Sequence, residues 1–377
     1  MRFKISDLVA VNMETLKAKD DVFDVEYADT GSVTAGIFGP AEYFESLRQA
    51  PSRARRVAMA GDTVYSTVRP NQRHFGFITN ELANRVYSTG FAVLHPNPEK
   101  VLPYYFYLIM NQEWVTETLQ SVGSGSTSAY PSIKPGDILN LEVEVPDLET
   151  QRRIVNIFQS LDGKVRVNNQ INDNLFELSK ILFEAVLEDD RSELTNLANL
   201  TDIQNGFAFK SKEYIGFSDT PIVRTLNIGA DNLFDMQNLK YISDESRTKY
   251  KKFEFKTFDT ALVMVGASIG KTGFVTSRTN GGLQNQNMWR FRPLNSEMPG
   301  LYIYNLVTYA NSQMQGYKTG SAREFYTKDA FKNFEVPVGN ADIYKAFFAI
   351  QDLLDNNASQ TTALTAMRDE ILTQVMA

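Results

Sequence analysis

The sequence states one pattern twice: Gly61-Asp62-Thr63-Val64-Tyr65 runs on to Gly76-Phe77-Ile78, and Phe258-Asp259-Thr260-Ala261-Leu262 runs on to Gly273-Phe274-Val275. Further along the chain, other motifs of the two copies correspond in the same order. Residues 125–130 correspond to residues 320–325, and Val143-Glu144-Val145-Pro146 corresponds to Phe334-Glu335-Val336-Pro337. A block of this length that occurs only twice exceeds the roughly 20–50-residue periods of solenoids. The repeat therefore predicts two homologous domains, each followed by a helix.

Each domain is predicted to be mixed, with strands dominant. Runs rich in β-branched and aromatic residues, bounded by turn residues, predict strands. These runs are residues 63–68, 91–95, 139–145, 221–226, 261–265 and 287–291. One helix is expected in each domain, at 103–119 and at 299–315, because both segments begin at a proline and are rich in Tyr and Leu. The predicted fold class is α+β.

Two long segments have the apolar spacing of a coiled coil. Ile154, Phe158, Leu161, Val165, Asn168, Asn172, Leu175, Ser179 and Leu182 alternate by four and three residues, as do Ile350, Leu354, Asn357, Thr361, Leu364, Arg368, Ile371 and Val375. About 40 residues at about 1.5 Å each form a rod of about 60 Å. If domain and helix repeat as a unit, a pseudo-twofold relation makes the two rods antiparallel and brings the termini close together. The expected organisation is domain one at 1–147, a helix at 148–190, domain two at 191–337 and a second helix at 338–377.

The composition excludes several classes of protein. The 377 residues contain no cysteine, which excludes disulfides and thiolate metal sites and favours a reducing compartment. No apolar run of about 18 residues is present, so no membrane span is predicted. The first residues do not resemble a secretory signal. These features together predict a cytoplasmic protein that does not bind membranes.

The net charge of −7 is unevenly distributed along the chain. Residues 1–147 carry 13 Lys and Arg against 18 Asp and Glu, whereas residues 191–337 carry 18 against 14. Basic patches remain at residues 53–56 and 249–252, and local patches matter more than totals for contact with phosphates. An ordinary solvated surface is the alternative interpretation of both patches.

The stretch Val265-Gly266-Ala267-Ser268-Ile269-Gly270-Lys271-Thr272 resembles a phosphate-binding loop only superficially. Such a loop needs four residues between its first glycine and the Gly-Lys pair, and here three separate Gly266 from Gly270. The corresponding stretch of the first copy, residues 69–75, has no such pattern. We therefore favour a tight polar turn between two strands in both copies, and a nucleotide-binding enzyme remains a minor alternative.

The same turn is the leading candidate for base recognition. Arginine matches guanine bidentately, and asparagine or glutamine matches adenine, in the major groove of DNA. The first copy presents Arg69, Asn71, Gln72, Arg73 and His74, and the second presents Ser268 and Lys271. Two domains that recognise different DNA sequences need different side chains at the same position of the fold, and this turn has them. A variable solvent loop is the alternative.

A second candidate loop precedes the last strand of each domain. Gly-rich loops with hydroxyl side chains suit phosphate oxygens, although a flexible connector would look alike. The candidates are Ser124, Ser126, Thr127 and Tyr130 in the first copy and Arg323 and Tyr326 in the second, with Asn285 as a weaker addition. No catalytic or metal-ligating set is evident, because His74 and His95 lack ligand spacing and the repeated Asp62 and Asp259 are better suited to stabilising turns.

The chain resembles the specificity subunits of type I restriction-modification enzymes. The resemblance rests on Gly61-Asp62-Thr63, on residues 66–71 and 266–271, and above all on Val145-Pro146-Asp147-Leu148-Glu149-Thr150-Gln151-Arg152-Arg153-Ile154-Val155. It covers essentially the whole chain. The second copy departs from the pattern, because Val336-Pro337-Val338-Gly339-Asn340-Ala341 lacks the Leu-Glu-x-Gln run.

The resemblance implies a subunit that is not an enzyme. It implies two target recognition domains that read the halves of a split, asymmetric site in double-stranded DNA, with paired helices that set the spacer. The helices would dock two modification (methyltransferase) subunits, and a restriction subunit can join. S-adenosylmethionine, ATP and Mg would then belong to those partners, with no cofactor in this chain. The helix entry supplies the expected partner-binding residues Gln151, Arg152, Ile154, Phe158 and Leu161. A coiled-coil scaffold without DNA specificity is the alternative function.

Overall fold

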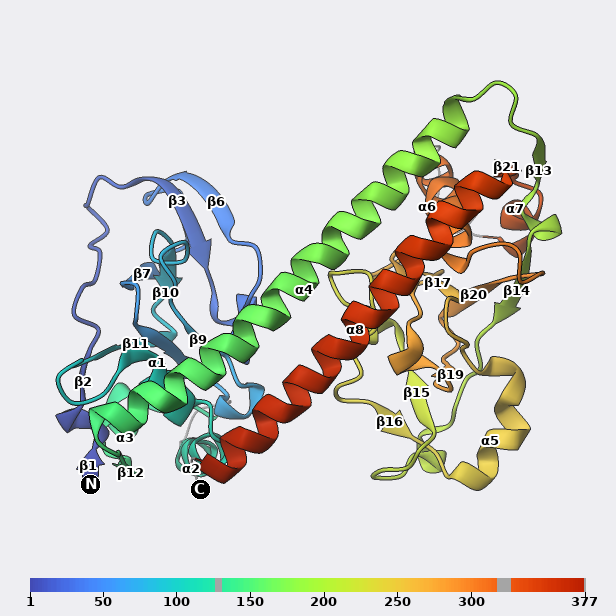
Figure 1. The fold of residues 1–377 in the computed structure, drawn as a ribbon. Helices are drawn as coiled ribbons and strands as arrows, with labels where there is room; N and C mark the ends of the chain where they lie inside the picture. Colours follow the sequence, from blue (N-terminus) through green and yellow to red (C-terminus); the bar gives the residue numbers. More distant parts are fainter. Residues whose placement is uncertain (126–130, 317–326, 376–377) are drawn as a thin grey trace. The chain divides into compact units, whose positions relative to one another are not determined.

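The computed structural model describes residues 1–125, 131–316 and 327–375. By contacts the chain divides into two compact units, of which unit 1 comprises residues 1–161 and 367–377 and unit 2 comprises residues 162–366. Helices and sheets occur in both units, which confirms the α+β class. Each unit contains part of both long helices, α4 (Leu148–Glu188) and α8 (Ala341–Val375) (Figure 1).

Unit 1 consists of short strands and three short helices, besides its part of the long ones. The strands are β1 (Arg2–Lys4), β2 (Val9–Val11), β3 (Phe23–Ala28), β4 (Val33–Thr34), β5 (Ile37–Phe38), β6 (Glu42–Ser46), β7 (Ala54–Val57), β8 (Thr63–Ser66), β9 (Phe75–Phe77), β10 (Val86–Ser88), β11 (Phe91–Pro96) and β12 (Glu142–Glu144). The helices are α1 (Pro103–Met110), α2 (Glu113–Ser124) and α3 (Pro135–Leu139).

Unit 2 repeats this plan with fewer strands. They are β13 (Leu194–Asn196), β14 (Thr201–Asn205), β15 (Pro221–Val223), β16 (Lys240–Tyr241), β17 (Thr260–Val263), β18 (Thr272–Phe274), β19 (Leu283–Gln284), β20 (Met288–Pro293) and β21 (Glu335–Pro337). The helices are α5 (Asp244–Tyr250), α6 (Gly300–Gly316) and α7 (Lys328–Lys332).

Three sheets of unit 1 have counterparts in unit 2, and the small β4-β5 sheet of unit 1 has none among the described residues. The order β2-β11-β8-β9 in unit 1 matches β14-β20-β17-β18 in unit 2, and the pair β1-β12 matches β13-β21. The third sheet is β6-β3-β10-β7 in unit 1 and β16-β15-β19 in unit 2, and each contains one parallel pair, β3 with β10 and β15 with β19. The repeat found in the sequence is therefore a repeat of topology.

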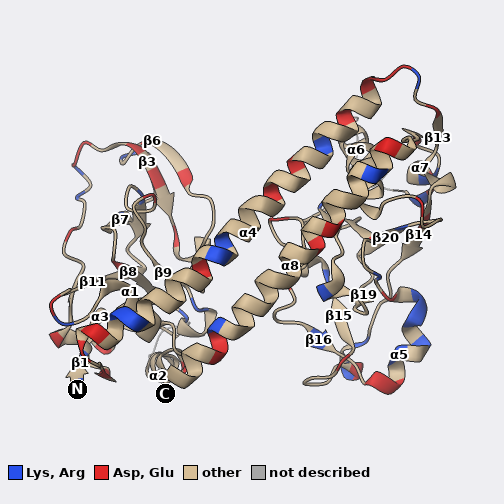
Figure 2. Cartoon of the chain, in the orientation of Figure 1, with Lys and Arg blue, Asp and Glu red and all other residues tan. Residues whose placement is uncertain are grey.

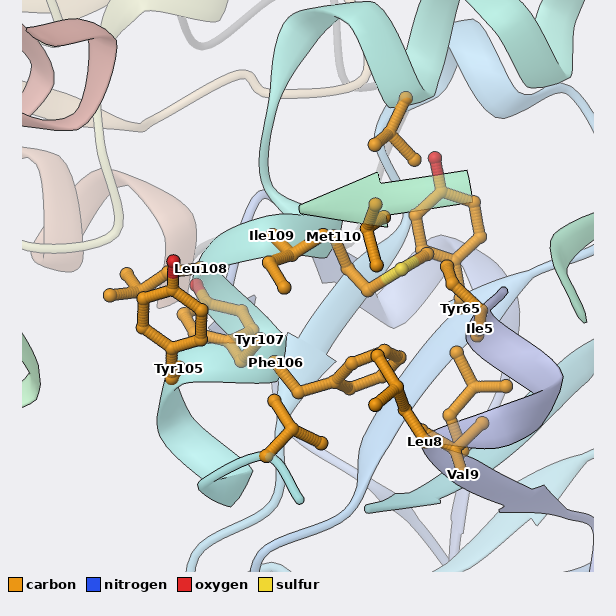
Figure 3. Packing of buried hydrophobic residues seen from close by; sticks show 14 of the residues in the cluster. Ile5, Leu8, Val9, Tyr65, Tyr105, Phe106, Tyr107, Leu108, Ile109 and Met110 are labelled. Carbon is orange, nitrogen blue, oxygen red and sulfur yellow. The ribbon is translucent and has the colours of Figure 1, made fainter. Parts of the chain in front are cut away.

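The main core of unit 1 forms where α1 packs on the β2-β11-β8-β9 sheet. Tyr105, Phe106, Leu108, Ile109 and Met110 are all buried, and Phe106 and Met110 point toward residues of the first turn and of β8 (Figure 3). Nearly every residue of α1 is apolar, and a helix that is apolar all round is buried on all sides. This helix anchors the strands that support the β8–β9 loop.

Two of the predicted elements are wrong in detail. The helix expected at 103–119 is two helices, because Gln112 is extended (φ −65°, ψ 143°) and starts α2 after α1 has ended. The strand expected at 139–145 is only β12, since its first residue, Leu139, closes α3. Both segments are rich in apolar residues, and short apolar runs do not distinguish helix from strand.

The coiled-coil spacing is confirmed where α4 and α8 pack together in unit 2. Asn168 is buried and donates from Nδ2 to Gln360 Oε1 of α8 at 2.9 Å. Further along α4, Phe183 contacts the ring of Tyr302, which also contacts Phe347 near the start of α8. The two helices therefore run antiparallel within unit 2.

Beyond Leu175 the spacing on α4 continues but the packing partner changes. Ser179 Oγ accepts a hydrogen bond from Asn305 of α6 at 3.1 Å, and Phe183 packs on Tyr302 and Tyr309 of the same helix. This stretch of the spacing buries α4 against α6 as well as α8. A period of seven residues indicates a buried stripe, and it does not identify the element that covers the stripe.

A buried glutamine fastens each long helix to its unit. Gln151 accepts a hydrogen bond from the Leu102 amide at 2.8 Å, and Gln351 accepts one from the Leu301 amide at 3.2 Å. The second copy therefore does contain the glutamine of the helix entry, seven residues deeper in its helix. The apolar residues that follow correspond as well, Ile154 to Leu354 and Phe158 to Ala358, and all four are buried.

Candidate nucleic-acid interface

The β8–β9 and β17–β18 loops adopt the same backbone turn with different residues. In the first loop Arg69 and Arg73 have positive φ values of 50° and 55°. At the corresponding positions of the second loop stand Gly266 and Gly270, with φ values of 96° and 84°. A left-handed conformation costs a non-glycine residue about 1–2 kcal/mol. The first unit thus keeps two arginines where glycine would be less strained, which points to a use for their side chains.

Each loop is fastened to the helix beside it through an asparagine. In unit 1, Arg73 donates from Nη2 to Asn111 Oδ1 at 2.8 Å and to the Asn111 carbonyl at 3.1 Å, at the break between α1 and α2. In unit 2, Asn311 of α6 donates from Nδ2 to the Gly270 carbonyl at 2.9 Å. The break in the predicted helix therefore has a structural role, since it presents Asn111 to the loop.

Of the unit 1 residues predicted to contact bases, some are hydrogen-bonded within the fold and others are exposed at the tip of the loop. His74 Nδ1 lies 2.6 Å from the Val33 carbonyl, and Arg73 is anchored as described. Asn71 and Gln72 are exposed at the tip, although the Asn71 amide bonds to Gln120 of α2 and Gln72 Oε1 lies 3.1 Å from His74 Nε2. Arg69 is half-buried, and its backbone amide donates to the Pro131 carbonyl.

The unit 2 loop is not a nucleotide-binding loop. A phosphate-binding loop leads into a helix, whereas residues 264–271 lead from β17 into β18. Lys271 donates from Nζ to the Ile228 carbonyl, so this ammonium is used within the fold. Ser268 is half-buried in the loop, and the exposed tip consists of Val265, Gly266 and Ala267. Sequence reasoning did not select Val265, although an apolar side chain in a Gly-rich hairpin turn is the signal that could have found it.

The repeated aspartates stabilise the turn before each hairpin, as the sequence predicts. Asp62 accepts from the Met59 amide at 2.8 Å, and Asp259 accepts from the Lys256 amide at 2.7 Å. Each carboxylate also meets a basic residue of the neighbouring strand, His95 at 2.6 Å in unit 1 and Arg292 at 2.6 Å in unit 2.

Burial dominates the electrostatics of both aspartates. It raises the pKa of Asp62 and of Asp259 above the usual carboxyl value, although the hydrogen bonds and basic partners act in the opposite direction. The corresponding pairs differ in kind, because a histidine can lose its charge near neutral pH and an arginine cannot. Unit 1 thus has an imidazole where unit 2 has a guanidinium.

The second candidate loop is described only at its edge. Ser124 belongs to the last turn of α2 and donates from Oγ to the Gln120 carbonyl at 2.8 Å, so it lies on a helix. Ser126, Thr127, Tyr130, Arg323 and Tyr326 lie outside the described residues. Asn285 is largely buried, and its amide donates to the Val223 carbonyl beside β19.

Unit 2 carries the stronger exposed basic group. Lys249, Lys251 and Lys252 are exposed on α5 and the turn that follows it (Figure 2). Lys249 and Lys252 lie over the rings of Tyr250 and Phe253 at 4.7 and 4.8 Å. In the corresponding unit 1 patch, residues 53–56, two arginines form hydrogen bonds within the unit. Arg56 donates to Thr15 Oγ1, and Arg55 donates to the Ala54 carbonyl.

The expected partner-binding residues also divide by burial. Gln151 is fully buried and donates to the Pro146 and Lys100 carbonyls, while Ile154 and Phe158 belong to the unit 1 core. These three side chains hold α4 to its own domain, and their role as partner contacts stays a prediction. Arg152 is exposed and Leu161 is half-buried, so both stay candidates.

Two features are absent from residues 1–125, 131–316 and 327–375. No helix there is long and apolar enough to cross a membrane. No group of three or more acidic or histidine side chains in that part of the chain is placed to hold a metal ion.

Comparison with known proteins identifies the family. The model of the type I restriction modification DNA specificity domain matches residues 1–177 and again residues 190–366. The chain therefore belongs to the family of type I restriction-modification DNA specificity subunits. The two matches coincide with the two copies of the repeat.

Individual relatives agree with this assignment. The chain is 31% identical over 166 residues to the type I restriction enzyme HindI specificity subunit of Haemophilus influenzae, which covers 44% of this chain and 36% of that protein. It is 21% identical over 275 residues to the MjaVIII specificity subunit of Methanocaldococcus jannaschii, covering 67% of this chain and 63% of the other. The matches thus span less than two thirds of either relative. Among solved structures, the S subunit of a type I restriction-modification system from M. genitalium shares the fold, with a TM-score of 0.53, 14% identity and coverage of 100% and 96%.

Proposed function

We propose that this chain is the non-catalytic subunit that reads a bipartite, asymmetric site in double-stranded DNA, with one half-site for each unit. The observation that carries the proposal is the pair of matched hairpin loops, residues 69–74 and 264–271. They share a backbone turn and an asparagine anchor and differ in the side chains at their tips. Two loops with the same backbone turn and different side chains at the tip are suited to the recognition of two different DNA sequences.

The chemistry of the tips suggests what each loop reads. Asn71 and Gln72 carry amides, and an amide side chain pairs bidentately with the major-groove edge of adenine. Val265 and Ala267 are apolar, and apolar side chains contact the methyl group of thymine. In this proposal Arg73 is chiefly a positioning residue that holds the loop through Asn111, and Ser268 and Lys271 shape the second loop.

Phosphate contacts position such a protein on the duplex and carry no sequence information. Lys249, Lys251 and Lys252 are suited to this role in unit 2, because they are exposed and are held against aromatic rings. Unit 1 has fewer uncommitted cations and more acidic residues. Much of the affinity for phosphates therefore comes from unit 2 and from partner subunits.

The long helices serve as spacer and as docking surface in this proposal. Two modification subunits bind on them, with Arg152 and Leu161 as candidate contacts, and a restriction subunit can join the complex. S-adenosylmethionine, ATP and Mg belong to those partners. The antiparallel packing of α4 and α8 within unit 2 supports a rigid spacer.

Mapping of methylated adenines tests the proposal directly. The complex with modification subunits should methylate a split site, and the double substitution Asn71→Ala with Gln72→Ala should relax one half-site only. Each lost bidentate contact is worth about 1–3 kcal/mol of discrimination. The matched control is Gln49→Ala, an exposed glutamine outside the loops of unit 1. Relaxation of both half-sites, or of neither, would contradict the assignment of the loop.

A protein-interaction scaffold is the alternative function, and DNA binding separates the two. The complex should bind a duplex with the mapped site more tightly than one with both half-sites scrambled, at a stated salt concentration. Equal binding to the two duplexes would favour the scaffold.

A further inference from the structure

We propose that the β4–β5 hairpin of unit 1 is a second element of the recognition site, and that Ile37 contacts the C5-methyl group of a thymine in the half-site of this unit. The inference rests on the proposed function, because it adds a contact beside the 69–74 loop. Ile37 is 76% exposed and is the first residue after the turn that joins β4 to β5.

Backbone hydrogen bonds join this hairpin to the end of the 69–74 loop. The Ala35 amide donates to the Arg73 carbonyl at 2.7 Å, and the Gly36 amide donates to the Phe75 carbonyl at 2.9 Å. Ala35 and Gly36 have positive φ values of 48° and 85°, as a tight turn that matches the twist of paired strands requires. Because the turn itself makes these bonds, the hairpin and the loop form one surface.

The pairing of the hairpin determines which way Ile37 faces. Thr34 and Ile37 are directly opposite each other in the register of β4 and β5, and side chains of such a pair lie on the same face. Thr34 Oγ1 is 3.1 Å from His74 Nδ1, and His74 Nε2 is 3.1 Å from Gln72 Oε1. Ile37 therefore lies on the face of the hairpin that borders the polar side chains of the 69–74 loop.

The other face of the hairpin is packed into the unit. Val33 is fully buried, and a Cβ at Gly76 of β9 would meet both Val33 and the ring of Phe38. The absence of a side chain at Gly76 thus lets the hairpin lie directly on β9. A side chain presented by an element that is held in this way is already in position, which lowers the entropic cost of a contact.

Unit 2 has a corresponding hairpin without the exposed side chain. Ile228 and Phe234 are joined by a single bridge and pack against Gly273, as their unit 1 equivalents pack on β9. Leu233 takes the position of Ile37, but it is only 2% exposed and belongs to the main core of unit 2. The fold therefore does not require an exposed apolar residue at this position, and its presence in unit 1 suits a contact that unit 2 does not make.

The chemistry of Ile37 restricts what it can recognise. An isoleucine side chain has no donor or acceptor, so it cannot bind a phosphate or the polar edge of a base. In the major groove the C5-methyl group of thymine is the apolar feature of a base pair, and apolar side chains contact it. Asn71 and Gln72, the amides proposed to pair with adenine, are exposed in the adjoining loop. The contact therefore belongs to a thymine in the same half-site as that adenine.

Replacement of thymine by deoxyuridine tests the contact, because it removes only the C5-methyl group. The protein is the complex with modification subunits, and the probes are duplexes of the mapped site in which each thymine of the unit 1 half-site is replaced in turn. One replacement should weaken binding by the wild-type complex about fourfold, or about 0.8 kcal/mol, the value of one buried methylene-sized group. The complex with Ile37→Ala should bind that duplex and the unmodified duplex equally.

A matched control uses another exposed apolar side chain of unit 1. Met13 is 61% exposed and lies beside Pro96, at the end of the β8–β11 pair away from the 69–74 loop. Met13→Ala should retain the fourfold preference for thymine. Deoxyuridine in the half-site of unit 2 should affect the wild-type and Ile37→Ala complexes alike.

The outcomes separate this inference from the proposed function. If Asn71→Ala with Gln72→Ala relaxes one half-site but no deoxyuridine distinguishes the wild-type complex from Ile37→Ala, only the inference is overturned. Equal binding of the wild-type complex to scrambled DNA would overturn both. Loss of modification subunits from the Ile37→Ala complex, measured as its mass in solution, would assign Ile37 to a protein contact and would also overturn the inference.

Discussion

Asn311 donates a hydrogen bond from Nδ2 to the carbonyl oxygen of Gly270 at 2.9 Å and so ties the β17–β18 loop to α6. Unit 1 makes the corresponding tie in the reverse direction, because Arg73 donates to Asn111. Both loops are therefore held from the same side by a helix that is buried in its own unit. Support of this kind keeps a recognition loop in one conformation before it meets a ligand, which lowers the entropic cost of binding.

Asn311→Ala should loosen the unit 2 loop and leave the unit 1 loop unchanged. Loss of one hydrogen bond to a backbone carbonyl costs about 1 kcal/mol. Hydrogen exchange should become faster at the amides of residues 266–271 and stay unchanged at residues 69–74. The adjacent Ser312→Ala is the control, since the exposed Ser312 side chain donates to the Tyr309 carbonyl within its own helix. Unchanged exchange in both loops would show that this hydrogen bond does not hold the loop.

The Asp62–His95 pair should make the stability of unit 1 depend on the size and charge of residue 95. His95→Ala removes the basic partner of a buried carboxylate, and we expect a loss of about 2–3 kcal/mol in the free energy of unfolding. His95→Arg recreates the pair that Asp259 and Arg292 form in unit 2, so it should retain most of the stability. Denaturant unfolding of the three proteins measures this, and equal destabilisation by both substitutions would contradict it.

Asp62 should also give unit 1 a defined pH dependence. Burial raises the pKa of Asp62 in the folded state above the unfolded value of about 3.9. Its favourable contribution is therefore complete below pH of about 4 and is lost as pH rises through the folded pKa. Asp62→Asn should flatten the stability of unit 1 over that range, as unfolding at a series of pH values will show. A wild-type curve that rises there, with no change in the variant, would oppose the assignment.

Gly76 should not tolerate a side chain. A Cβ at this position would lie 2.4 Å from the ring of Phe38, and Gly273 stands in the same relation to Phe234 at 2.9 Å. Gly76→Ala should cost about 1–3 kcal/mol, as overpacking usually does. The double variant with Phe38→Leu should recover part of the loss in thermal unfolding. If Gly76→Ala alone is neutral, the close approach is not a constraint.

The two buried glutamines should differ in their importance. Gln151→Ala leaves the Leu102 amide and two carbonyls without their partner, whereas Gln351→Ala leaves only the Leu301 amide. Each unsatisfied buried group costs about 1–3 kcal/mol. Gln151→Ala should therefore lower the unfolding temperature more than Gln351→Ala does, and the reverse order would show that the hydrogen bonds are not the main contribution.

Insertion of one heptad into each long helix should lengthen the spacer of the DNA site. Lys164 and Leu364 lie level with each other if the contact between Asn168 and Gln360 is extended along the two antiparallel helices. Seven residues add about 10 Å of helix, which corresponds to about three base pairs at about 3.4 Å each. Methylation mapping should show the same half-sites with a longer spacer. An unchanged spacer would exclude the helices as the ruler.

The sequence alone determined the features that depend on local patterns and on repetition. The two-copy order of motifs established two homologous units, the spacing of apolar residues established two long helices, and the polar stretches between strands 63–66 and 75–77 and their equivalents established the hairpin loops. These signals are strong because strands alternate and helices recur at fixed periods whatever their partners. The turn-stabilising aspartates were also visible, since an acid before a strand in both copies has a local role.

The tertiary structure decided which side chains remain free to act. Gln151, Ile154 and Phe158 are predicted partner contacts, and only the structure shows that the domain beside α4 buries them, because a periodic stripe does not reveal what covers it. Gln351 performs the role of Gln151 from a position seven residues deeper, which an alignment of motifs without gaps misses. Arg73 looked like a base reader, and only the break after α1 places Asn111 where the guanidinium binds it. Contacts between residues far apart in the chain depend on packing, and packing is not encoded in any local stretch of sequence.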